Sequence, residues 1–184
     1  MNSNWFKIFL KLFKVEYGKN LTLKGVPFIY NSGGGLQIGD NVCIKSSFIS
    51  NLVGLYQRTI ILTRTSAAVI NIGNNVGISG AVIYARIGIE IGDNTVIGGN
   101  CKILDNDFHP IEIGARNADI KEKIGVREII IGKNCFIGCN SIILKGTILG
   151  DGCVVGAGAV VSGVFEDNCV IAGNPARVIK KIDQ

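Results

Sequence analysis

The sequence predicts an all-β fold in which short parallel strands wind into a solenoid. Three observations support this prediction. Aliphatic residues recur every six positions over long stretches, glycine accounts for 25 of the 184 residues, and proline occurs only 3 times. A period of six fits neither the 3.6-residue repeat of an α-helix nor the alternation of a hairpin strand. If each six-residue unit contributes one strand and one turn, three units complete a triangular coil of about eighteen residues.

The repeat is clearest in the C-terminal half and extends, with breaks, towards the N-terminus. Its clearest aliphatic positions are Ile131, Ile137, Ile143, Leu149, Val155 and Val161. Earlier stretches contain Ile38 and Ile44; Ile72, Ile78 and Tyr84; and Ile91, Ile97 and Ile103. We expect all these side chains to point into the coil. The fourth residue after such a position is small or β-branched, which places Cys101, Cys135 and Cys153 inside as compact apolar groups.

The repeat divides the chain into three segments. Residues 1–20 contain a basic amphipathic stretch in which Lys7, Lys11 and Lys14 share one helical face, and apolar residues cover much of the rest. We expect a short N-terminal helix that either covers the open end of the solenoid or contacts an anionic membrane. Residues 21–166 form the solenoid, and residues 167–184 form a C-terminal tail with a short helix.

The longest interruption of the repeat, at residues 104–128, predicts a loop that projects from the solenoid. It is rich in charged residues and contains Pro110 and the only histidine, His109. Rigid scaffolds commonly carry functional residues on such loops. Because imidazole accepts and returns protons near neutral pH, His109 is the strongest candidate for a general base. Asp105 and Asp107 flank it and are candidates to orient the imidazole or to bind hydroxyl groups of a substrate.

Charge and composition restrict the function classes without choosing one. The formal net charge of +5 favours an anionic partner, such as nucleic acid, acidic lipid or a phosphorylated cofactor. No uninterrupted apolar stretch reaches the length of about 18 residues that spans a bilayer. The six cysteines lack the spacing of a zinc knuckle, and no cleavable secretory signal leads the chain. We therefore expect reduced thiols and a cytoplasmic location, with any membrane contact at its inner face.

Four features resemble the hexapeptide-repeat acyltransferases: the repeats themselves, DNDFHPI at residues 105–111, the run at residues 129–161, and AGNPARVIKKI at residues 172–182. Within that family the chain is similar to the galactoside and maltose O-acetyltransferases, including those of polysaccharide biosynthesis. The resemblance implies a left-handed parallel β-helix and a homotrimer with active sites between subunits. It also implies acetyl-CoA as acyl donor and a sugar or cell-surface polysaccharide precursor as acceptor, with no metal and no nucleic acid.

The resemblance assigns roles to individual residues as well. It makes His109 the catalytic base that removes a proton from the acceptor hydroxyl. Residues expected to contact the acceptor are Ser79, Asp105, Asp107, Arg116 and Arg127. Residues expected to bind coenzyme A are Phe136, Cys139, Ala157, Ser162, Arg177 and Lys180, of which the last two are basic positions for its phosphates. Ser79 stands where related sugar acetyltransferases have an asparagine.

Other functions are compatible with the same repeat. N-acetylation of an amino sugar attached to a nucleotide would use the same fold and base, and a non-catalytic β-helix binding protein is a third hypothesis. A γ-type carbonic anhydrase is excluded, because it needs three histidines for each zinc and the chain has one. Cys139 is a poor candidate for a nucleophile, because no second histidine is present to activate a thiol.

Overall fold

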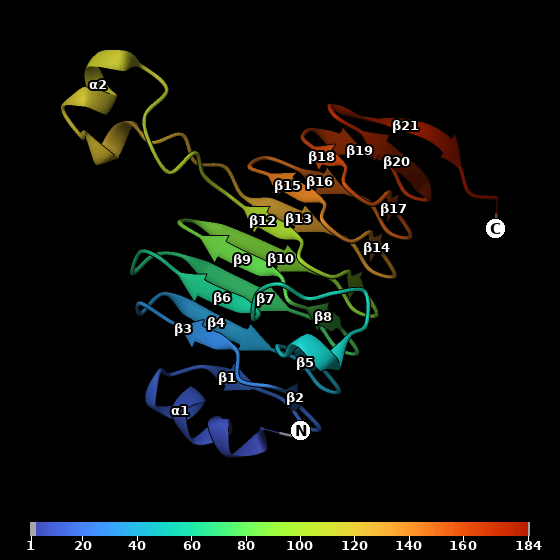
Figure 1. The fold of residues 1–184 in the computed structure, drawn as a ribbon. Helices are drawn as coiled ribbons and strands as arrows, with labels where there is room; N and C mark the ends of the chain where they lie inside the picture. Colours follow the sequence, from blue (N-terminus) through green and yellow to red (C-terminus); the bar gives the residue numbers. More distant parts are fainter. Residues whose placement is uncertain (1–2, 184) are drawn as a thin grey trace.

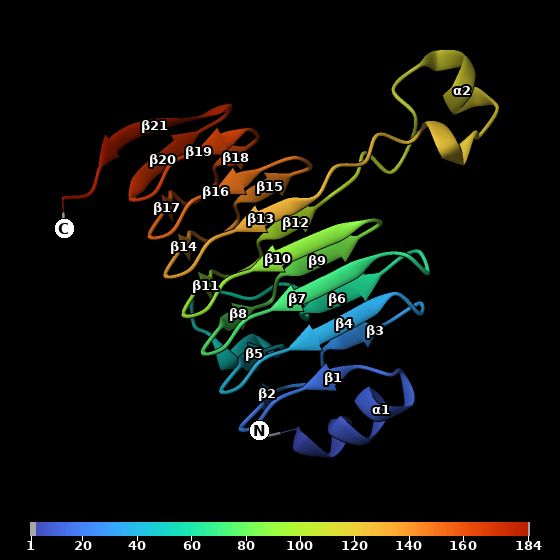
Figure 2. The same cartoon turned by 180° about the vertical axis from the view of Figure 1, so that it is seen from behind.

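The computed structural model describes residues 3–183, which form the coil that the six-residue repeat predicts. Its strands stack in three sheets, and each sheet is one face of a triangular prism (Figures 1 and 2). The chain passes from face to face in a fixed order, so that every third strand belongs to the same sheet until the coil ends. We number the faces I, II and III in the order in which the chain first reaches them. The expected left-handed parallel β-helix is confirmed.

The strands are short. Face I contains β1 (Glu16–Tyr17), β4 (Gly35–Ile38), β7 (Val69–Ile72), β10 (Gly88–Ile91), β13 (Ile129–Ile131), β16 (Ile148–Leu149) and β19 (Val164–Phe165). Face II contains β2 (Thr22–Lys24), β5 (Cys43–Lys45), β8 (Gly77–Ser79), β11 (Val96–Ile97), β14 (Phe136–Ile137), β17 (Val154–Val155), β20 (Cys169–Gly173) and β21 (Ala176–Lys181). Face III contains β3 (Phe28–Tyr30), β6 (Ile60–Thr63), β9 (Val82–Ala85), β12 (Lys102–Leu104), β15 (Ile142–Leu144) and β18 (Val160–Val161).

Short helices lie at the start of the coil and in its interruptions. They are η1 (Asn4–Phe6), α1 (Lys7–Leu12), η2 (Phe48–Ser50), α2 (Ile113–Asn117) and η3 (Lys121–Lys123). The predicted N-terminal helix is confirmed as η1 and α1, which lie across the open end of the coil (Figure 1). Leu10 is fully buried there, and the Ser3 N–H donates to the Leu23 carbonyl at 2.9 Å. The helix therefore covers the first coil.

The interior is filled by the residues that the repeat placed inside. Ile137, Ile143 and Val155 are fully buried, and neighbouring coils stack them in register. Cys101 and Cys135 lie in the same interior, where burial raises the pKa of each thiol to about 11. Thiols with such a pKa stay protonated near neutral pH, so these cysteines act as apolar packing groups.

One inward position is predicted wrongly. Tyr84 is half-buried on the outer side of face III, and Ile83 fills the core in its place. The turn between β8 and β9 is short and contains Gly80 at a φ of +54°. The chain therefore advances five residues rather than six between the inward side chains of Ile78 and Ile83.

Asparagines form a ladder along the corner between faces I and II. Asn20, Asn41, Asn75 and Asn94 all have positive φ angles, a backbone conformation that asparagine tolerates better than most residues. Their side chains hydrogen-bond in a row, from Asn20 to Asn41 at 2.9 Å and onward through Asn75 to Asn94 at 3.0 Å each. The sharp turns of successive coils are thus tied to one another.

The expected C-terminal helix is wrong. Within the described residues the tail instead forms β20 and β21, which pair antiparallel as a hairpin. β20 also pairs in parallel with β17, so it adds a strand to face II. β21 then hydrogen-bonds to the outer edge of β20, whose backbone groups a helix would have left unpaired.

Candidate active site

The loop at residues 104–128 leaves the coil at the corner between faces III and I and projects from it (Figures 1 and 2). Its two ends are joined by an antiparallel bridge between Asn106 and Val126. The Asp107 N–H donates to the Gly125 carbonyl at 3.0 Å, and the Arg127 N–H donates to the Asp105 carbonyl at 2.9 Å. The predicted projecting loop is confirmed, and it has a hydrogen-bonded neck.

Asp105 lies inside this neck and does not face a ligand. Its side chain is fully buried. The carboxylate accepts hydrogen bonds from the backbone N–H groups of Arg86, Ile87 and Gly88 at 2.7–3.0 Å. The expected contact with an acceptor is therefore wrong: the carboxylate is enclosed and fixes the turn of the coil below the loop.

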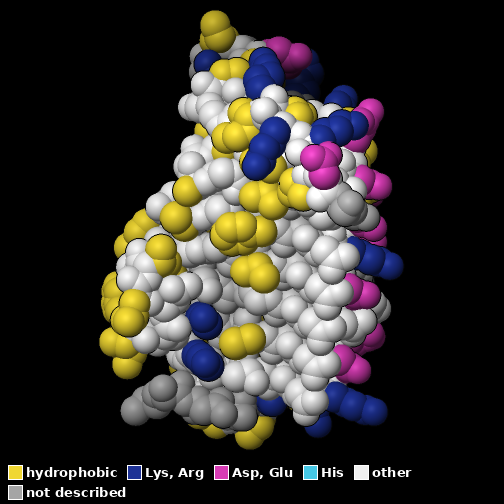
Figure 3. All heavy atoms as spheres, turned by 90° about the vertical axis from the view of Figure 1, so that its right-hand side faces the viewer, with side chains coloured by type: hydrophobic (Ala, Val, Ile, Leu, Met, Phe, Trp, Pro, Cys, Tyr) yellow, Lys and Arg dark blue, Asp and Glu magenta, His cyan; other side chains and the backbone are white. Residues whose placement is uncertain are grey.

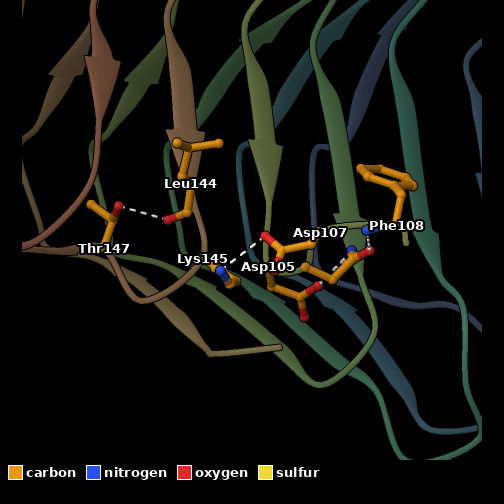
Figure 4. Close-up of polar contacts among 7 residues, drawn as sticks. Asp105, Asp107, Phe108, Leu144, Lys145 and Thr147 are labelled. Atoms are coloured by element: carbon orange, nitrogen blue, oxygen red, sulfur yellow. Dashed lines mark hydrogen bonds and ion pairs between the residues drawn. The ribbon is translucent and has the colours of Figure 1, made fainter. Parts of the chain in front are cut away.

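Asp107 lies closer to the surface and forms an ion pair. Its Oδ1 is 2.9 Å from the Nζ of Lys145, which follows β15 at the same corner (Figure 4). Its Oδ2 is buried and accepts no hydrogen bond from the described residues. Asp107 is thus held in place by one oxygen, while the other keeps an unused acceptor site.

His109 follows a tight turn that Phe108 fixes. The Phe108 N–H donates to Asn106 Oδ1 at 2.9 Å, its φ is +63°, and its ring lies 4.9 Å from that of Tyr84. The His109 N–H donates to the Asp107 carbonyl at 2.7 Å. The imidazole itself is exposed and has no hydrogen bond within residues 3–183. Its backbone is therefore fixed, and its ring is accessible to another molecule.

The two arginines of the loop differ in their surroundings. Arg116, on α2, donates from Nη1 to the carbonyls of Ile111 at 2.8 Å and Pro110 at 3.3 Å. It holds the backbone that follows His109. Arg127 is exposed at the neck, and its Cδ lies so near Gly146 that a Cβ there would be 2.3 Å away. Of these two arginines, only Arg127 has a guanidinium without a hydrogen bond inside the described chain.

A second group of predicted residues lines a cleft of about 560 Å³ on face II. Ser79, Phe136 and Cys139 all contribute to it, together with Asn51, Lys24 and Lys45. We call this the face II cleft. Figure 3 views this side of the molecule and shows hydrophobic side chains along it, with Lys or Arg side chains beside them.

One wall of the face II cleft is a segment at residues 46–58, which interrupts the repeat between faces II and III. Asn100, 3% exposed, accepts from the Tyr56 N–H at 3.2 Å and donates to the Gly54 carbonyl at 2.9 Å. Asn51 Nδ2 donates to Ser79 Oγ at 3.1 Å. At Gly99 a Cβ would lie 2.6 Å from Val53 Cγ1, so glycine is needed where the segment crosses.

The remaining residues expected to bind coenzyme A do not all lie together. Ala157 is exposed one coil beyond Cys139, where the Gly158 N–H donates to the Cys139 carbonyl at 2.9 Å. Arg177 and Lys180 are exposed on β21, at the far end of the same sheet. Ser162 instead follows β18 at the corner between faces III and I. Every predicted coenzyme A residue except Ser162 thus lies on face II or at its corner with face III.

Within one chain, His109 and the face II cleft are not brought together. His109 lies at the corner between faces III and I, and the strands of face III separate it from the corner with face II.

The sequence did not point to four residues that the structure places at these sites: Lys24, Lys45, Asn51 and Lys145. The segment at residues 46–58 lengthens the chain between Lys45 and Ser79, so the alignment of these two residues along one face is hidden in the sequence.

A family model described as the hexapeptide repeat of succinyl-transferase matches residues 88–116 and 128–162, on both sides of the loop. A Klebsiella pneumoniae protein described as an uncharacterized 24.8 kDa protein in cps region is 57% identical over 95 residues. That match covers 51% of this chain and 40% of the relative, so the chain spans less than half of the relative's length.

Two kinds of solved structure share the fold. AntD, an N-acyltransferase from Bacillus cereus in complex with dTDP and 3-hydroxybutyryl-CoA, matches with a TM-score of 0.75 and 25% identity. The match covers 100% of this chain and 92% of AntD. A galactoside acetyltransferase in complex with coenzyme A matches with a TM-score of 0.60 and 25% identity, over 96% of this chain and 69% of that one.

Proposed function

We propose that this hexapeptide-repeat protein, which shares its fold with acyltransferases solved with coenzyme A or an acyl-CoA, transfers an acyl group from a coenzyme A thioester to a sugar. The observation that carries the proposal is the pairing of an exposed, positioned histidine with a separate apolar cleft. His109 can act as a base, and the face II cleft can hold an extended thioester. Each chain supplies both halves, on different sides.

The two halves are completed by assembly. In a homotrimer with parallel coils, the loop of one chain would face the cleft of its neighbour, so three equivalent sites would form. The loop is suited to this role because its neck and Arg116 fix the backbone on both sides of His109. A preorganised base of this kind needs no rearrangement when the neighbour supplies the donor.

In the proposed reaction His109 removes the proton from the acceptor hydroxyl as its oxygen attacks the thioester carbonyl. A carbon–oxygen bond forms, the carbon–sulfur bond breaks, and the imidazolium returns the proton to the departing thiolate. Asp107 has a buried oxygen with an unused acceptor site beside this turn, which would stabilise the imidazolium by charge. General base catalysis of this kind contributes about 10²- to 10⁴-fold.

The donor is proposed to lie along face II. Phe136 and Cys139 line the cleft, Ala157 continues its edge, and Arg177 and Lys180 provide positive charge at the far end. Apolar and small groups followed by cations fit an extended arm that ends in phosphates. The thioester, when bound, supplies an activated acyl carbon, and we propose that the acyl group is acetyl.

The acceptor is proposed to be a sugar of a cell-surface polysaccharide precursor, acylated on a hydroxyl in the cytoplasm. The description of the Klebsiella pneumoniae relative, which places it in a cps region, supports this acceptor class. The second candidate is an amine on a nucleotide-linked amino sugar. It is favoured by the likeness to AntD, one structure of which contains dTDP-4-amino-4,6-dideoxyglucose and coenzyme A.

The outward side of α1 is proposed to contact an anionic membrane. Ile8 and Leu12 of α1 and Trp5 of the preceding η1 are 58–71% exposed, away from buried Leu10. Lys7 and Lys11 flank this apolar side, and no acidic residue lies between Ser3 and Val15. No helix within residues 3–183 is both long and apolar enough to cross a bilayer. An amphipathic contact at the surface suits such a helix.

The proposed function is tested with a His109→Ala variant and labelled acetyl-CoA, using cell-envelope glycans as the acceptor pool. We expect release of the coenzyme A thiol to fall about 10²-fold or more while the assembly keeps its size in gel filtration. Glu122→Gln, an exposed change in the same loop, is the matched control and should leave the rate unchanged. Equal rates for wild type and His109→Ala would remove His109 from the mechanism.

The labelled product distinguishes the two acceptor candidates. Mild alkali cleaves an ester and leaves an amide intact. Loss of the label therefore supports transfer to a hydroxyl, whereas retention overturns it in favour of the amine.

A further inference from the structure

Two lysines lie side by side at the N-terminal end of the face II cleft. Lys24 on β2 and Lys45 on β5 are direct register partners in the sheet, and Ser79 on β8 is the next partner along. Paired residues in neighbouring strands point to the same side, and both lysines line the cleft. The cleft therefore has two positive charges at one end, followed by the hydroxyl of Ser79.

These charges are not neutralised by the described chain. Among residues 3–183, neither lysine has a carboxylate within ion-pair distance, whereas Lys145 and Lys181 each pair with an acidic residue. Like charges on directly opposite strand positions destabilise a sheet. Their presence together in a cleft is explained if an anion binds between or beside them.

The position of the pair separates it from the proposed coenzyme A phosphates. Arg177 and Lys180 lie beyond β20, and five strand spacings along face II, about 24 Å, separate β20 from β5. Between the two basic ends the cleft is lined by Val96 and Phe136. One sheet thus has a basic group at each end and an apolar stretch between them.

We propose that Lys24 and Lys45 bind the phosphate or diphosphate that links the acceptor sugar to its carrier. The inference rests on the proposed function, because it assumes that face II also holds the donor. A phosphate at the lysines would bring the attached sugar next to Ser79 and Asn51, whose side chains are already hydrogen-bonded to each other at 3.1 Å. The acceptor is then a carrier-linked sugar rather than a free one, and the carrier is a nucleoside or a lipid.

The test measures binding of inorganic pyrophosphate, UDP and farnesyl diphosphate by calorimetry. In Lys24→Ala/Lys45→Ala we expect the affinity for pyrophosphate to fall about tenfold or more, because hydrogen bonds to charged groups are lost. The control is Lys19→Ala/Lys133→Ala, which removes two exposed lysines from the corner between faces I and II. It should change the affinity for pyrophosphate less than about twofold. Tighter binding of UDP than pyrophosphate supports a nucleotide carrier, and tighter binding of farnesyl diphosphate supports a lipid carrier. Equal pyrophosphate affinity in wild type and Lys24→Ala/Lys45→Ala overturns the proposal.

Two further measurements keep this test independent of folding and of the proposed function. Lys24→Ala or Lys45→Ala alone should raise the melting temperature in phosphate-free buffer, because the repulsion between the two lysines is relieved. A general loss of folding would instead lower the melting temperature. Coenzyme A affinity is measured on the same proteins. If Lys24→Ala/Lys45→Ala weakens coenzyme A rather than pyrophosphate, the lysines serve the donor and the proposal is wrong. Pyrophosphate binding by the lysines without acyl transfer would instead leave the subsite standing and count against the proposed function.

Discussion

Asp105 and Asp107 are two residues apart and have different roles. The carboxylate of Asp105 is enclosed by backbone N–H groups of the preceding coil, whereas Asp107 pairs with Lys145 at the surface. A buried carboxylate needs several donors to offset the loss of hydration. Asp105 has them, so we assign it to the support of the loop, two residues before the turn that carries Phe108 and His109.

This assignment predicts a loss of stability when the charge is removed. In Asp105→Asn an amide nitrogen replaces one carboxylate oxygen. This NH2 group faces backbone N–H groups and cannot accept hydrogen bonds from them. We expect the free energy of unfolding to fall by about 2 kcal/mol or more, measured by urea denaturation. Asp119→Asn, in the same loop and exposed, should change it by less than about 0.5 kcal/mol. Equal losses for both variants would contradict the supporting role.

The sequence could not separate these two aspartates, because both follow β12 within a charged stretch. What distinguishes them is the backbone of residues 86–88, which lies a coil away. The same limitation applies to Tyr84. Its sequence position fits the six-residue phase, but the short turn at Gly80 moves it outward, where its ring meets Phe108.

Among the elements, α1 has two sides with separate roles. Its inner side carries Leu10 and covers the first coil, and its outer side exposes Ile8 and Leu12 at 68% and 71%. The two predictions made for this segment, a cover and a membrane contact, therefore do not exclude each other. The burial of Leu10 agrees with the first, and the second stays a proposal.

The outer side of α1 is tested with Ile8→Ser/Leu12→Ser, which removes exposed apolar groups without touching Leu10. We expect the wild-type protein to sediment with vesicles that contain phosphatidylglycerol, and the variant to bind them roughly tenfold less because less apolar surface is buried. Val164→Ser, 74% exposed on face I, is the control and should bind like wild type. Wild-type protein that stays in the supernatant with anionic vesicles would contradict the membrane contact.

The strand positions were predictable because burial repeats every six residues, and the inward isoleucines report it directly. The hairpin of the C-terminal tail was not predictable, because residues 169–181 do not show that face II ends in an exposed edge. β21 pairs with β20 at that edge, so its structure depends on the whole sheet rather than on local preference.

At the scale of the whole molecule, His109 and the face II cleft lie apart in one chain, so the proposed trimer can be tested by mixing two inactive variants. His109→Ala lacks the base, and Cys139→Trp fills the cleft, so each variant alone should be inactive. When the two are refolded together in equal amounts, about a quarter of all the sites, those in unmixed trimers included, combine an intact histidine with an open cleft. We expect activity to return to that extent in the coenzyme A release assay.

Two observations check this result. Each variant must keep the elution volume of the wild-type assembly, so that loss of activity reflects the site and not the assembly. A mixture that stays as inactive as its components would show that His109 and the cleft do not combine across chains. Such an outcome would leave the fold unaffected and remove the shared site from the proposal.

The hydrogen-bonded neck of the loop also bears on how such proteins diversify. Asn106 and Val126 close the loop where it leaves the coil, so the strands on either side are held in register whatever lies beyond. The entropic free-energy cost of closing a flexible loop grows slowly, by about 0.6 kcal/mol for each doubling of the loop length. Insertions, deletions or exchanges beyond the neck would therefore leave the scaffold nearly unchanged, and new acceptor preferences could evolve there without the fold having to be rebuilt.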